Sequence, residues 1–446
     1  MTIISLNSPE FGHFRKGVHL IPRPGFHRHG YAFYLTFSWP RECLAGLGTG
    51  PGSHPILHEV TMKYSALKSI PWFAAALWVN VHATDAAKTA AQKAAPAPMK
   101  SASQAQEKKF LMGYYPNWSH YNGYTADKIP FEYMTHLLYA FYLTDPAGNL
   151  TNSDPLDAEN FKDVIRLGHA KGVKIILSIG GAGQSDGFKA VAASAGARAN
   201  FIKNALKLCD QYQLDGIDLD WEFPAEGDGE NQVKLHQEIR AAFDKQPRKI
   251  LFTAAVAATN WFGQWSKDEA FKALDYLNCM TYDYMGTWEK AVIPNSGMDL
   301  SKGTLDYYEQ RGIPRSKLVL GAAFYGKSFD GGTDMGSPFQ GKGSGNDGLW
   351  DWKDLLAQFE AVPYKIRWDE KTQSEYAVGN DEIIVFNGIP STRARGEFIR
   401  NSDYAGVMLW DLLQDTPDPK KSLLVALYRG LHGTNHSPLS APSQPY

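Results

Sequence analysis

Short apolar runs alternate with longer amphipathic segments along most of the chain after residue 109. The runs rich in β-branched and aromatic residues predict eight strands. These strands are 110–115, 136–142, 174–179, 216–221, 250–256, 276–282, 317–324 and 406–410. Helical spacing of apolar residues predicts helices at 157–171, 231–245 and 301–310. Strands with intervening crossovers favour an α/β protein with a closed parallel (β/α)8, or TIM, barrel, and an open doubly wound sheet is the alternative.

The interval between the seventh and eighth predicted strands is too long for a single helix. Residues 327–388 begin with a Gly-rich stretch and then alternate like strands at 376–378 and 382–386. This pattern predicts a small α+β insertion between strand 7 and helix 7. Such an insertion extends a loop on the rim where barrel active sites are built.

The first hundred residues have a different character. Residues 62–83 contain a basic start with Lys63 and Lys68, an apolar run at 70–81 and small residues after it, the order typical of a secretory signal peptide. We therefore expect secretion, extracellular or periplasmic, with no integral membrane segment after signal cleavage. Residues 1–61 precede this signal, so we expect them to be a non-native segment from an over-extended reading frame. A His-rich metal-binding arm is the alternative.

Two further segments lack a core-forming pattern. Residues 84–108 are rich in Ala, Pro, Ser and Lys and predict a flexible linker. Residues 434–446 are polar and contain several Pro, which predicts a disordered tail. The folded unit is therefore expected at 109–433.

Composition narrows the function classes. The chain has 446 residues, of which 43% are hydrophobic and 21% charged, so it supports a large globular core. Its formal net charge of -2 gives no electrostatic reason to expect nucleic acid as a partner. Cys43, Cys209 and Cys279 are too few and too scattered for a disulfide framework or a cysteine-type zinc site.

The fourth predicted strand carries the candidate chemistry. Side chains alternate between the two faces of a strand, so Asp218, Asp220 and Glu222 point into the barrel, while Ile217 and Leu219 point outward. Neighbouring acids on this face lie about 6.6 Å apart, which raises the pKa of at least one of them. A carboxylic acid that keeps its proton near neutral pH is what a glycosidic leaving group needs. A calcium or magnesium cluster and a chance acidic strand are the alternatives.

At these residues the sequence resembles the glycoside hydrolase family 18 chitinases, of the bacterial type with a small insertion domain. The family pattern D-x-x-D-x-D-x-E is met by Asp215, Asp218, Asp220 and Glu222. Further matches are Gly113-Tyr114-Tyr115, Tyr139-Ala140-Phe141, Ser178-Ile179-Gly180-Gly181, Met280-Thr281-Tyr282-Asp283 and Trp410. The resemblance covers about 110–430. Residues 322–324 and 385–388 depart from the family pattern, which affects the prediction of subsites rather than of the reaction.

The resemblance implies a chitinase that cleaves β-1,4 bonds between N-acetylglucosamine units by a retaining, substrate-assisted mechanism without a cofactor or metal. It implies that Glu222 is the acid and base, that Asp220 orients the acetamido group, and that Asp218 tunes Asp220. It also implies that Tyr282 binds the acetamido oxygen and that Trp410 forms the floor of the site. The resemblance also implies that Tyr114 and Ser178 brace Asp218, and that Asp215, Gly180 and Gly181 are motif residues. The full set of implied substrate-binding residues is Asp283, Met280, Trp410, Tyr114, Ser178, Trp118, Trp288 and Tyr325. Trp261, Trp350 and Trp352 are further candidates for stacking on sugars.

Three other functions are weighed against this one. Residues 321–328 match the phosphate-binding pattern G-x-x-x-x-G-K-S, but no helix start follows, so we interpret the match as chance. A non-catalytic chitin-binding lectin is disfavoured because Glu222 is present. An endo-β-N-acetylglucosaminidase acting on N-glycans or another N-acetylglucosamine polymer stays open. The expected partner is chitin or a chito-oligosaccharide, and the protein is expected to be a monomer.

Overall fold

A computed structural model of the protein describes residues 109–258 and 263–433. The predicted N-terminal segment, signal peptide, linker and tail lie outside these residues, as does Trp261. Within the described ranges, no helix combines the length and the apolar character needed to cross a lipid bilayer.

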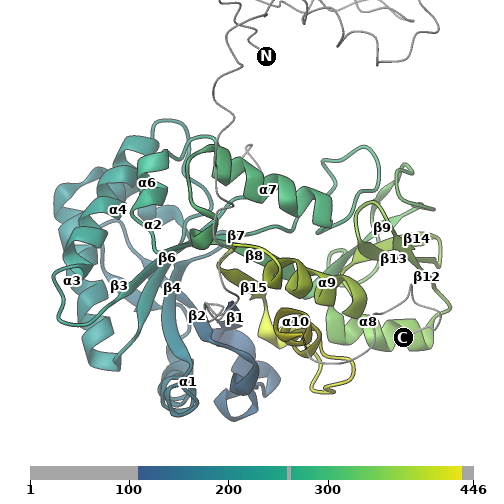
Figure 1. Cartoon of the computed structure of the whole chain (residues 1–446), viewed down its shortest axis with the longest axis horizontal. Helices are drawn as coiled ribbons and strands as arrows, with labels where there is room; N and C mark the ends of the chain where they lie inside the picture. The colour runs from purple at the N-terminus through teal and green to yellow at the C-terminus, as the bar shows by residue number, and fades with distance from the viewer. Residues whose placement is uncertain (1–108, 259–262, 434–446) are drawn as a thin grey trace, which may run out of the picture. The chain divides into compact units, whose positions relative to one another are not determined.

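Parallel strands form a closed barrel in the described part of the chain. They are β1 (Phe110–Pro116), β2 (His136–Thr144), β4 (Lys174–Gly180), β5 (Gly216–Asp220), β6 (Leu251–Val256), β7 (Tyr276–Cys279), β8 (Leu318–Ala323) and β15 (Gly406–Trp410). The sheet closes because β1 pairs with both β15 and β2 (Figure 1). Closure leaves none of these strands with a free edge. The predicted TIM barrel is therefore confirmed, and the open sheet is wrong.

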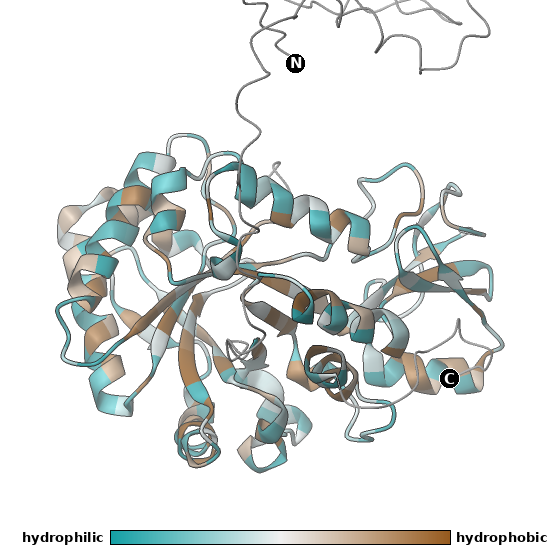
Figure 2. Ribbon diagram, viewed as in Figure 1, coloured by the Kyte–Doolittle hydropathy of each residue, from teal (hydrophilic) through white to brown (hydrophobic). Residues whose placement is uncertain are grey.

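Amphipathic helices cover the outside of the barrel. They are α1 (Ala158–Ala170), α2 (Asp186–Ala193), α3 (Ala195–Tyr212), α4 (Gly229–Phe243), α6 (Asp268–Lys272), α7 (Met298–Gln310), α9 (Ile389–Arg400) and α10 (Leu423–His432). In α1, Phe161, Val164 and Ile165 are buried at helical spacing, as predicted. Figure 2 shows apolar strands inside and hydrophilic positions on the helices around them.

The connection from β1 to β2 is built from 3-10 turns. These turns are η2 (Asn117–Asn122), η3 (Ala126–Lys128) and η4 (Phe131–Tyr133). After β2, the short strand β3 (Leu150–Asn152) pairs with it in antiparallel fashion, and η5 (Pro155–Asp157) leads into α1. The rim of the barrel above β1 and β2 therefore consists of tight turns that side chains must hold in place.

The insertion follows the seventh barrel strand, as predicted, and begins at Tyr325. It contains β9 (Tyr325–Asp330), β10 (Gly341–Lys342), β11 (Leu349–Asp351), α8 (Trp352–Ala361), β12 (Lys365–Asp369), β13 (Ser374–Gly379) and β14 (Glu382–Phe386). Its strands pair antiparallel in the order β10-β9-β14-β13-β12, and β11 pairs with β9. The α+β character of the insertion is confirmed.

Three predicted strands end earlier than expected: β5 and β8 by one residue each, and β7 by three. After β7, the N–H groups of Thr281 and Tyr282 donate to carbonyl oxygens two residues back, at 2.8 and 2.7 Å. These bonds turn the backbone, so it cannot continue the ladder with β8. Asp283 follows with a φ of 59°. The turn therefore leaves Tyr282 and Asp283 at the C-terminal rim of the barrel instead of inside a strand.

Candidate active site

The acidic residues of β5 lie on the inner face of the barrel. Asp218 and Asp220 are 0% and 4% exposed, and the alternating Ile217 and Leu219 belong to the apolar layer between strands and helices. Glu222 follows two residues after the end of β5. The predicted alternation is confirmed, and it leads from a fully buried acid to a partly exposed one at the barrel mouth.

Asp218 accepts hydrogen bonds from four side chains on the surrounding strands. Ser178 and Tyr114 donate to Oδ2 at 2.7 and 3.0 Å, which confirms the predicted bracing. Thr253 and Asn278 donate to Oδ1 at 2.5 and 3.1 Å. Burial raises the pKa of Asp218, while these four hydrogen bonds act in the opposite direction. Ser178 and Tyr114 are themselves buried and in contact with Asp218, so they lie beneath the site rather than on its surface.

Thr253 and Asn278 are not among the residues predicted from the sequence. They lie on β6 and β7, the strands that follow β5 in the barrel. A weak signal existed, because each is a polar residue within an otherwise apolar predicted strand. That signal identifies an inward-facing polar side chain, but it does not say which acid the side chain contacts.

Asp220 and Glu222 interact directly. Burial raises the pKa of Asp220 well above its ordinary value, and the charges of Glu222 and Asp218 raise it further. Burial also raises the pKa of Glu222 to about 7, with the charge of Asp283 as the second cause. A hydrogen bond from Asp220 opposes this rise. The pKa values of both carboxyl groups are therefore raised, and the sequence predicts such a rise for at least one of them.

One oxygen of Asp220 is a buried acceptor that lacks a donor. Its Oδ1 atom receives no hydrogen bond from the residues that the structure describes. A buried acceptor without a partner costs free energy, so this oxygen is suited to a donor that arrives with a ligand.

The segment after β7 places a tyrosine and an aspartate beside these acids. Tyr282 is 7% exposed, and burial raises its pKa, with the charges of Asp220, Asp283 and Glu222 adding to the rise. Asp283 accepts a hydrogen bond from Tyr325 at 2.7 Å and forms an ion pair with Lys327 at 2.5 Å. Tyr325 and Lys327 lie on β9, the first strand of the insertion. The insertion therefore contributes directly to the wall of the site.

Lys327 belongs to the phosphate-binding pattern at 321–328. Lys327 lies within the strand β9, and its Nζ donates to the Met285 carbonyl at 3.0 Å. The pattern needs a helix N-terminus after the lysine, so the chance interpretation is confirmed.

Aromatic rings line the β1–β2 side of the site. The Trp410 ring is stacked on Phe141 at 5.7 Å and lies 6.5 Å from the ring of Trp118. Two glycines keep the neighbouring wall open. A Cβ at Gly180 would meet the Asp220 carbonyl at 2.3 Å, and one at Gly181 would meet the Phe141 ring at 2.6 Å. Both have a positive φ, so no other residue fits there without strain.

The remaining predicted residues have different environments. Trp288 is 60% exposed, and the ammonium of Lys327 lies 5.7 Å from its ring centre. Met280 is partly buried against the aromatic cluster inside the barrel. Trp352 is 0% exposed in the core of the insertion, so its proposed role as a sugar-stacking surface is wrong. Trp350 is partly buried against the same core.

Asp215, the first acid of the motif, lies before β5 and away from the barrel mouth. It accepts hydrogen bonds from His169 and from the Ile175 backbone at 2.9 and 2.8 Å. These contacts tie α1 to β4, so Asp215 has structural contacts rather than contacts with the site.

Tyr121 is a rim aromatic that is not among the residues predicted from the sequence. It is 63% exposed and lies in η2, three residues after Trp118. Residues three apart in a 3-10 helix point the same way, about 6 Å apart along the axis. The spacing of the two aromatics is visible in the sequence, but the 3-10 conformation that aligns them is not.

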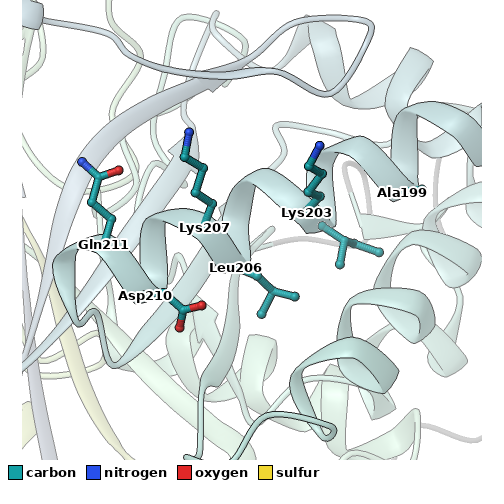
Figure 3. Close-up of a pocket in the computed structure, with 7 residues that line it drawn as sticks. Ala199, Lys203, Leu206, Lys207, Asp210 and Gln211 are labelled. Atoms are coloured by element: carbon teal, nitrogen blue, oxygen red, sulfur yellow. The ribbon is translucent and has the colours of Figure 1, made fainter.

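A surface hollow of about 830 Å³ lies apart from these residues. Figure 3 shows it on α3, lined by Ala199, Leu206, Lys203, Lys207 and Asp210 among others. None of its lining residues belongs to the acidic or aromatic groups described above. Among the described residues, no group of three or more His, Cys, Asp or Glu side chains is placed to hold a metal ion.

Comparisons with known proteins agree with this geometry. Residues 111–415 match the sequence profile of the glycosyl hydrolases family 18. Endochitinase 1 of Metarhizium robertsii is 29% identical over 372 residues, which covers 74% of this chain and 85% of the relative. Chitotriosidase-1 of Mus musculus is 28% identical over 375 residues and covers 75% of this chain and 80% of the relative. The catalytic domain 2 of the Ostrinia furnacalis Group II chitinase, solved in complex with (NAG)5, superposes with a TM-score of 0.68 at 27% identity and covers 76% of this chain and 98% of that one.

Proposed function

The chain belongs to the glycosyl hydrolases family 18, and from this premise we propose that it is a chitinase that hydrolyses the β-1,4 bonds between N-acetylglucosamine units. The names of its relatives and the (NAG)5 bound to a structural neighbour support this substrate. The observation that carries the proposal is the placement of Asp220 and Glu222 at successive inward positions, where they share a hydrogen bond.

This placement selects the mechanism. An ordinary retaining pair of carboxyl groups flanks the sugar from opposite faces. Asp220 and Glu222 lie two residues apart at one strand end, so they approach the scissile bond from the same side. The nucleophile is then the substrate's own 2-acetamido oxygen. It attacks C1 while the bond from C1 to the leaving oxygen breaks and Glu222 gives that oxygen its proton.

The second half of the reaction restores the enzyme. The first step leaves an oxazolinium ion, whose positive charge Asp220 stabilises. The buried Oδ1 of Asp220, which lacks a donor among the described residues, accepts the N–H of the acetamido group. Water then attacks C1 from the face that the leaving group vacated, Glu222 takes a proton from this water, and the C1–acetamido bond breaks. The product keeps the anomeric configuration of the substrate.

Neighbouring groups orient the reacting sugar. Tyr282, beside Asp220, donates to the acetamido oxygen, and Asp283 contacts the same sugar. Trp410 forms the floor, and Trp118 and Tyr121 extend the aromatic surface outward. Trp288 offers an exposed ring for a further sugar on the side of the insertion.

Product analysis on three substrates tests this function. Chitohexaose, an N-glycosylated protein and cellohexaose, which lacks the acetamido group, are incubated with the enzyme and the products are identified by mass spectrometry and proton NMR. We expect cleavage of chitohexaose with retained configuration and none of cellohexaose. Cleavage of cellohexaose or an inverted product would contradict the mechanism, and preferential release of N-glycans would favour the endo-β-N-acetylglucosaminidase alternative.

The Glu222→Gln variant separates the hydrolase from the lectin alternative. Loss of the general acid should lower kcat by at least about a hundredfold, while chitohexaose binding persists. Unchanged hydrolysis in this variant would show that another group supplies the proton.

We further propose that the protein is secreted as a monomer. The signal-like segment at 62–83 supports secretion. The intact mass of the protein secreted by its native host tests this, and we expect the product to begin near residue 84. A product that retains residues before Met62 would refute the over-extended reading frame.

A further inference from the structure

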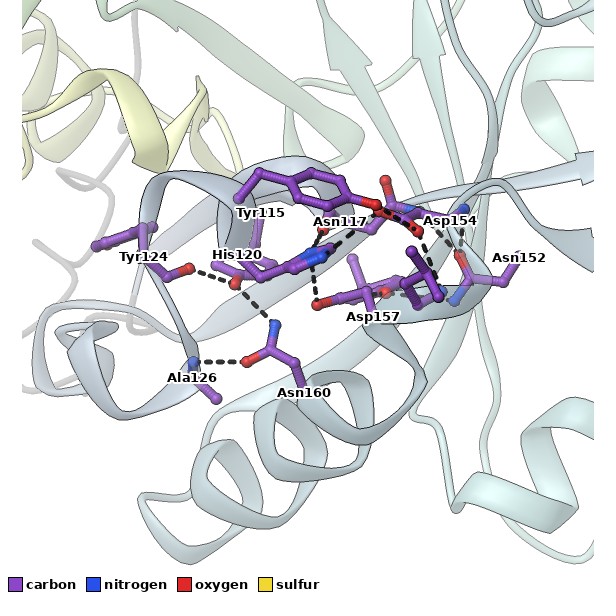
Figure 4. A network of polar contacts seen from close by, with 12 residues as sticks. Tyr115, Asn117, His120, Tyr124, Ala126, Asn152, Asp154, Asp157 and Asn160 are labelled. Atoms are coloured by element: carbon purple, nitrogen blue, oxygen red, sulfur yellow. Dashed lines mark hydrogen bonds and ion pairs between the residues drawn. The ribbon is translucent and has the colours of Figure 1, made fainter.

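His120 lies on η2, between Trp118 and Tyr121. The His120 ring packs against the Tyr121 ring with centres 3.9 Å apart. Its Nδ1 lies 2.7 Å from the Asn117 carbonyl and 3.0 Å from Oδ1 of Asp157 (Figure 4). A backbone carbonyl only accepts, so Nδ1 carries a proton and donates it to Asn117, while Oδ1 of Asp157 lies within ion-pair distance of Nδ1 without accepting a hydrogen bond from the described residues.

A second acidic residue lies on the other side of the ring. Nε2 of His120 is 3.8 Å from Oδ2 of Asp154. The Tyr121 hydroxyl donates to Oδ1 of the same carboxylate at 3.3 Å. His120 and Tyr121 are therefore tied to each other by ring contact and by a shared aspartate. This arrangement fixes the orientation of the exposed Tyr121 ring.

Asp157 connects His120 to the barrel wall. Its side chain is 0% exposed, and Oδ2 accepts the Tyr139 hydroxyl at 2.5 Å. A buried carboxylate needs a charged or hydrogen-bonding partner, and its Oδ1 faces His120. Tyr139 belongs to β2, so the contact runs from the barrel wall to η2.

The turn η2 is held by contacts with neighbouring segments. It is a 3-10 helix without a side-chain hydrogen bond at its N-cap, and such helices have weak hydrogen-bond geometry. Asn117 provides one external tie, because its Nδ2 donates to Asn152 and Ser153 at 2.8 and 2.7 Å. His120 provides a further tie, three residues along η2 and next to Tyr121.

We propose that His120 is a positioning residue that fixes Tyr121 as an outer stacking surface for chito-oligosaccharides and so sets the preference for long substrates. The proposal rests on the proposed function. Trp118 is held independently by its packing on Phe141 and Trp410. Loss of His120 therefore disturbs the outer position at Tyr121 and leaves the sugars nearest Glu222 unaffected.

Comparison of a long and a short substrate tests the proposal. Chitohexaose reaches past Trp118, whereas the chromogenic p-nitrophenyl chitobioside places two sugars next to Glu222. His120→Phe keeps an aromatic ring at this position but removes both ring nitrogens. We expect the ratio of kcat/KM for chitohexaose to that for the chitobioside to fall about three- to tenfold, mainly through KM of chitohexaose. His120→Asn, which can still donate toward Asp157, should restore part of the ratio.

A double-mutant cycle distinguishes positioning from general destabilisation. Tyr121→Ala should lower the same ratio of kcat/KM values to a similar extent, and the double variant should lose no more than Tyr121→Ala alone. The matched control is His169→Phe, because His169 pairs with Asp215 at 2.9 Å on the outside of the barrel. This control should leave the ratio unchanged.

Several outcomes would overturn the proposal. These are an equal loss on both substrates, additive losses in the double variant, or an unchanged ratio in His120→Phe. If the wild-type enzyme cleaves neither substrate, the proposed function itself fails. If the wild-type enzyme cleaves both substrates but the losses in the double-mutant cycle are additive, the proposed function stands and the proposed role of His120 is wrong.

Discussion

At the scale of single residues, the proton on Glu222 controls the reaction. Burial and the nearby charge of Asp283 raise its pKa to about 7, so the acid keeps its proton through the mildly acidic range. As the pH rises through 7 the proton is lost, and the leaving oxygen can no longer be protonated. We expect kcat/KM on chito-oligosaccharides to fall about tenfold per pH unit above this midpoint. A pH–rate profile that stays flat from pH 6 to 9 would contradict this assignment.

Lys327 offers a way to move that midpoint. Its ammonium forms an ion pair with Asp283 and offsets the negative charge that acts on Glu222. In Lys327→Met the charge of Asp283 is no longer compensated, so Glu222 holds its proton more tightly. We expect the alkaline limb of the pH–rate profile to move upward by roughly half a pH unit.

The control for this variant is Lys342→Met. Lys342 also lies on the insertion and pairs with Asp347, but both side chains are well exposed. Its loss should leave the midpoint of the profile in place. A downward shift in Lys327→Met would show that the sign of the interaction is wrong.

At the scale of elements, α9 supports the segment that carries Tyr282. Arg395 on α9 is 1% exposed, and burial lowers its pKa to about 10, so it stays charged at neutral pH. It donates to the hydroxyl oxygens of Ser301 and Ser296 at 3.1 and 2.8 Å. Ser296 in turn donates to the carbonyl of Thr281, the residue before Tyr282. This chain of contacts connects a helix on the outside of the barrel to the acetamido-binding position.

We therefore expect Arg395→Met to affect both stability and catalysis. Loss of the buried cation should lower the free energy of unfolding by on the order of 3 kcal/mol, measured by urea denaturation. Displacement of Tyr282 should lower kcat by about tenfold or more on chito-oligosaccharides.

Arg198→Met is the matched control for Arg395→Met. Arg198 is also a buried arginine, and from α3 it contacts Glu238 on α4 and the Ala192 carbonyl on α2. We expect this variant to lose stability with kcat nearly unchanged. If both variants lose activity equally, the effect of Arg395 is not specific to Tyr282.

At the scale of the whole molecule, the barrel and its insertion contain every part of the site that the structure describes. The family match begins at residue 111, and β1 starts at Phe110. Lys109 fixes this start, because its Nζ donates to the carbonyls of Ser402 and Tyr404 at 2.8 and 2.7 Å. We expect the fragment 109–433 to fold alone and to keep kcat/KM on chitohexaose within about twofold of the full chain. A fragment that is inactive or unfolded would show that the outer segments contribute to the enzyme.

The sequence by itself determined the features that depend on local periodicity. The two-residue repeat of a strand decides which side chains share a face, so Asp218, Asp220 and Glu222 could be placed inward without a structure. The alternation of strands and helices predicted the barrel, because each change of hydrophobic period marks a change of element. The excess length at 327–388 predicted the insertion. Strand ends were less accurate, because at β7 a local turn replaced the ladder.

Only the tertiary structure decided which distant residues meet. Thr253 and Asn278 reach Asp218 from neighbouring strands, and Lys327 reaches Asp283 from the insertion. Exposure was also decided by packing: Trp288 and Trp352 are both predicted to contact sugars, yet one is 60% exposed and the other is 0% exposed. No local period encodes such contacts, since they depend on how separate segments are brought together when the barrel closes.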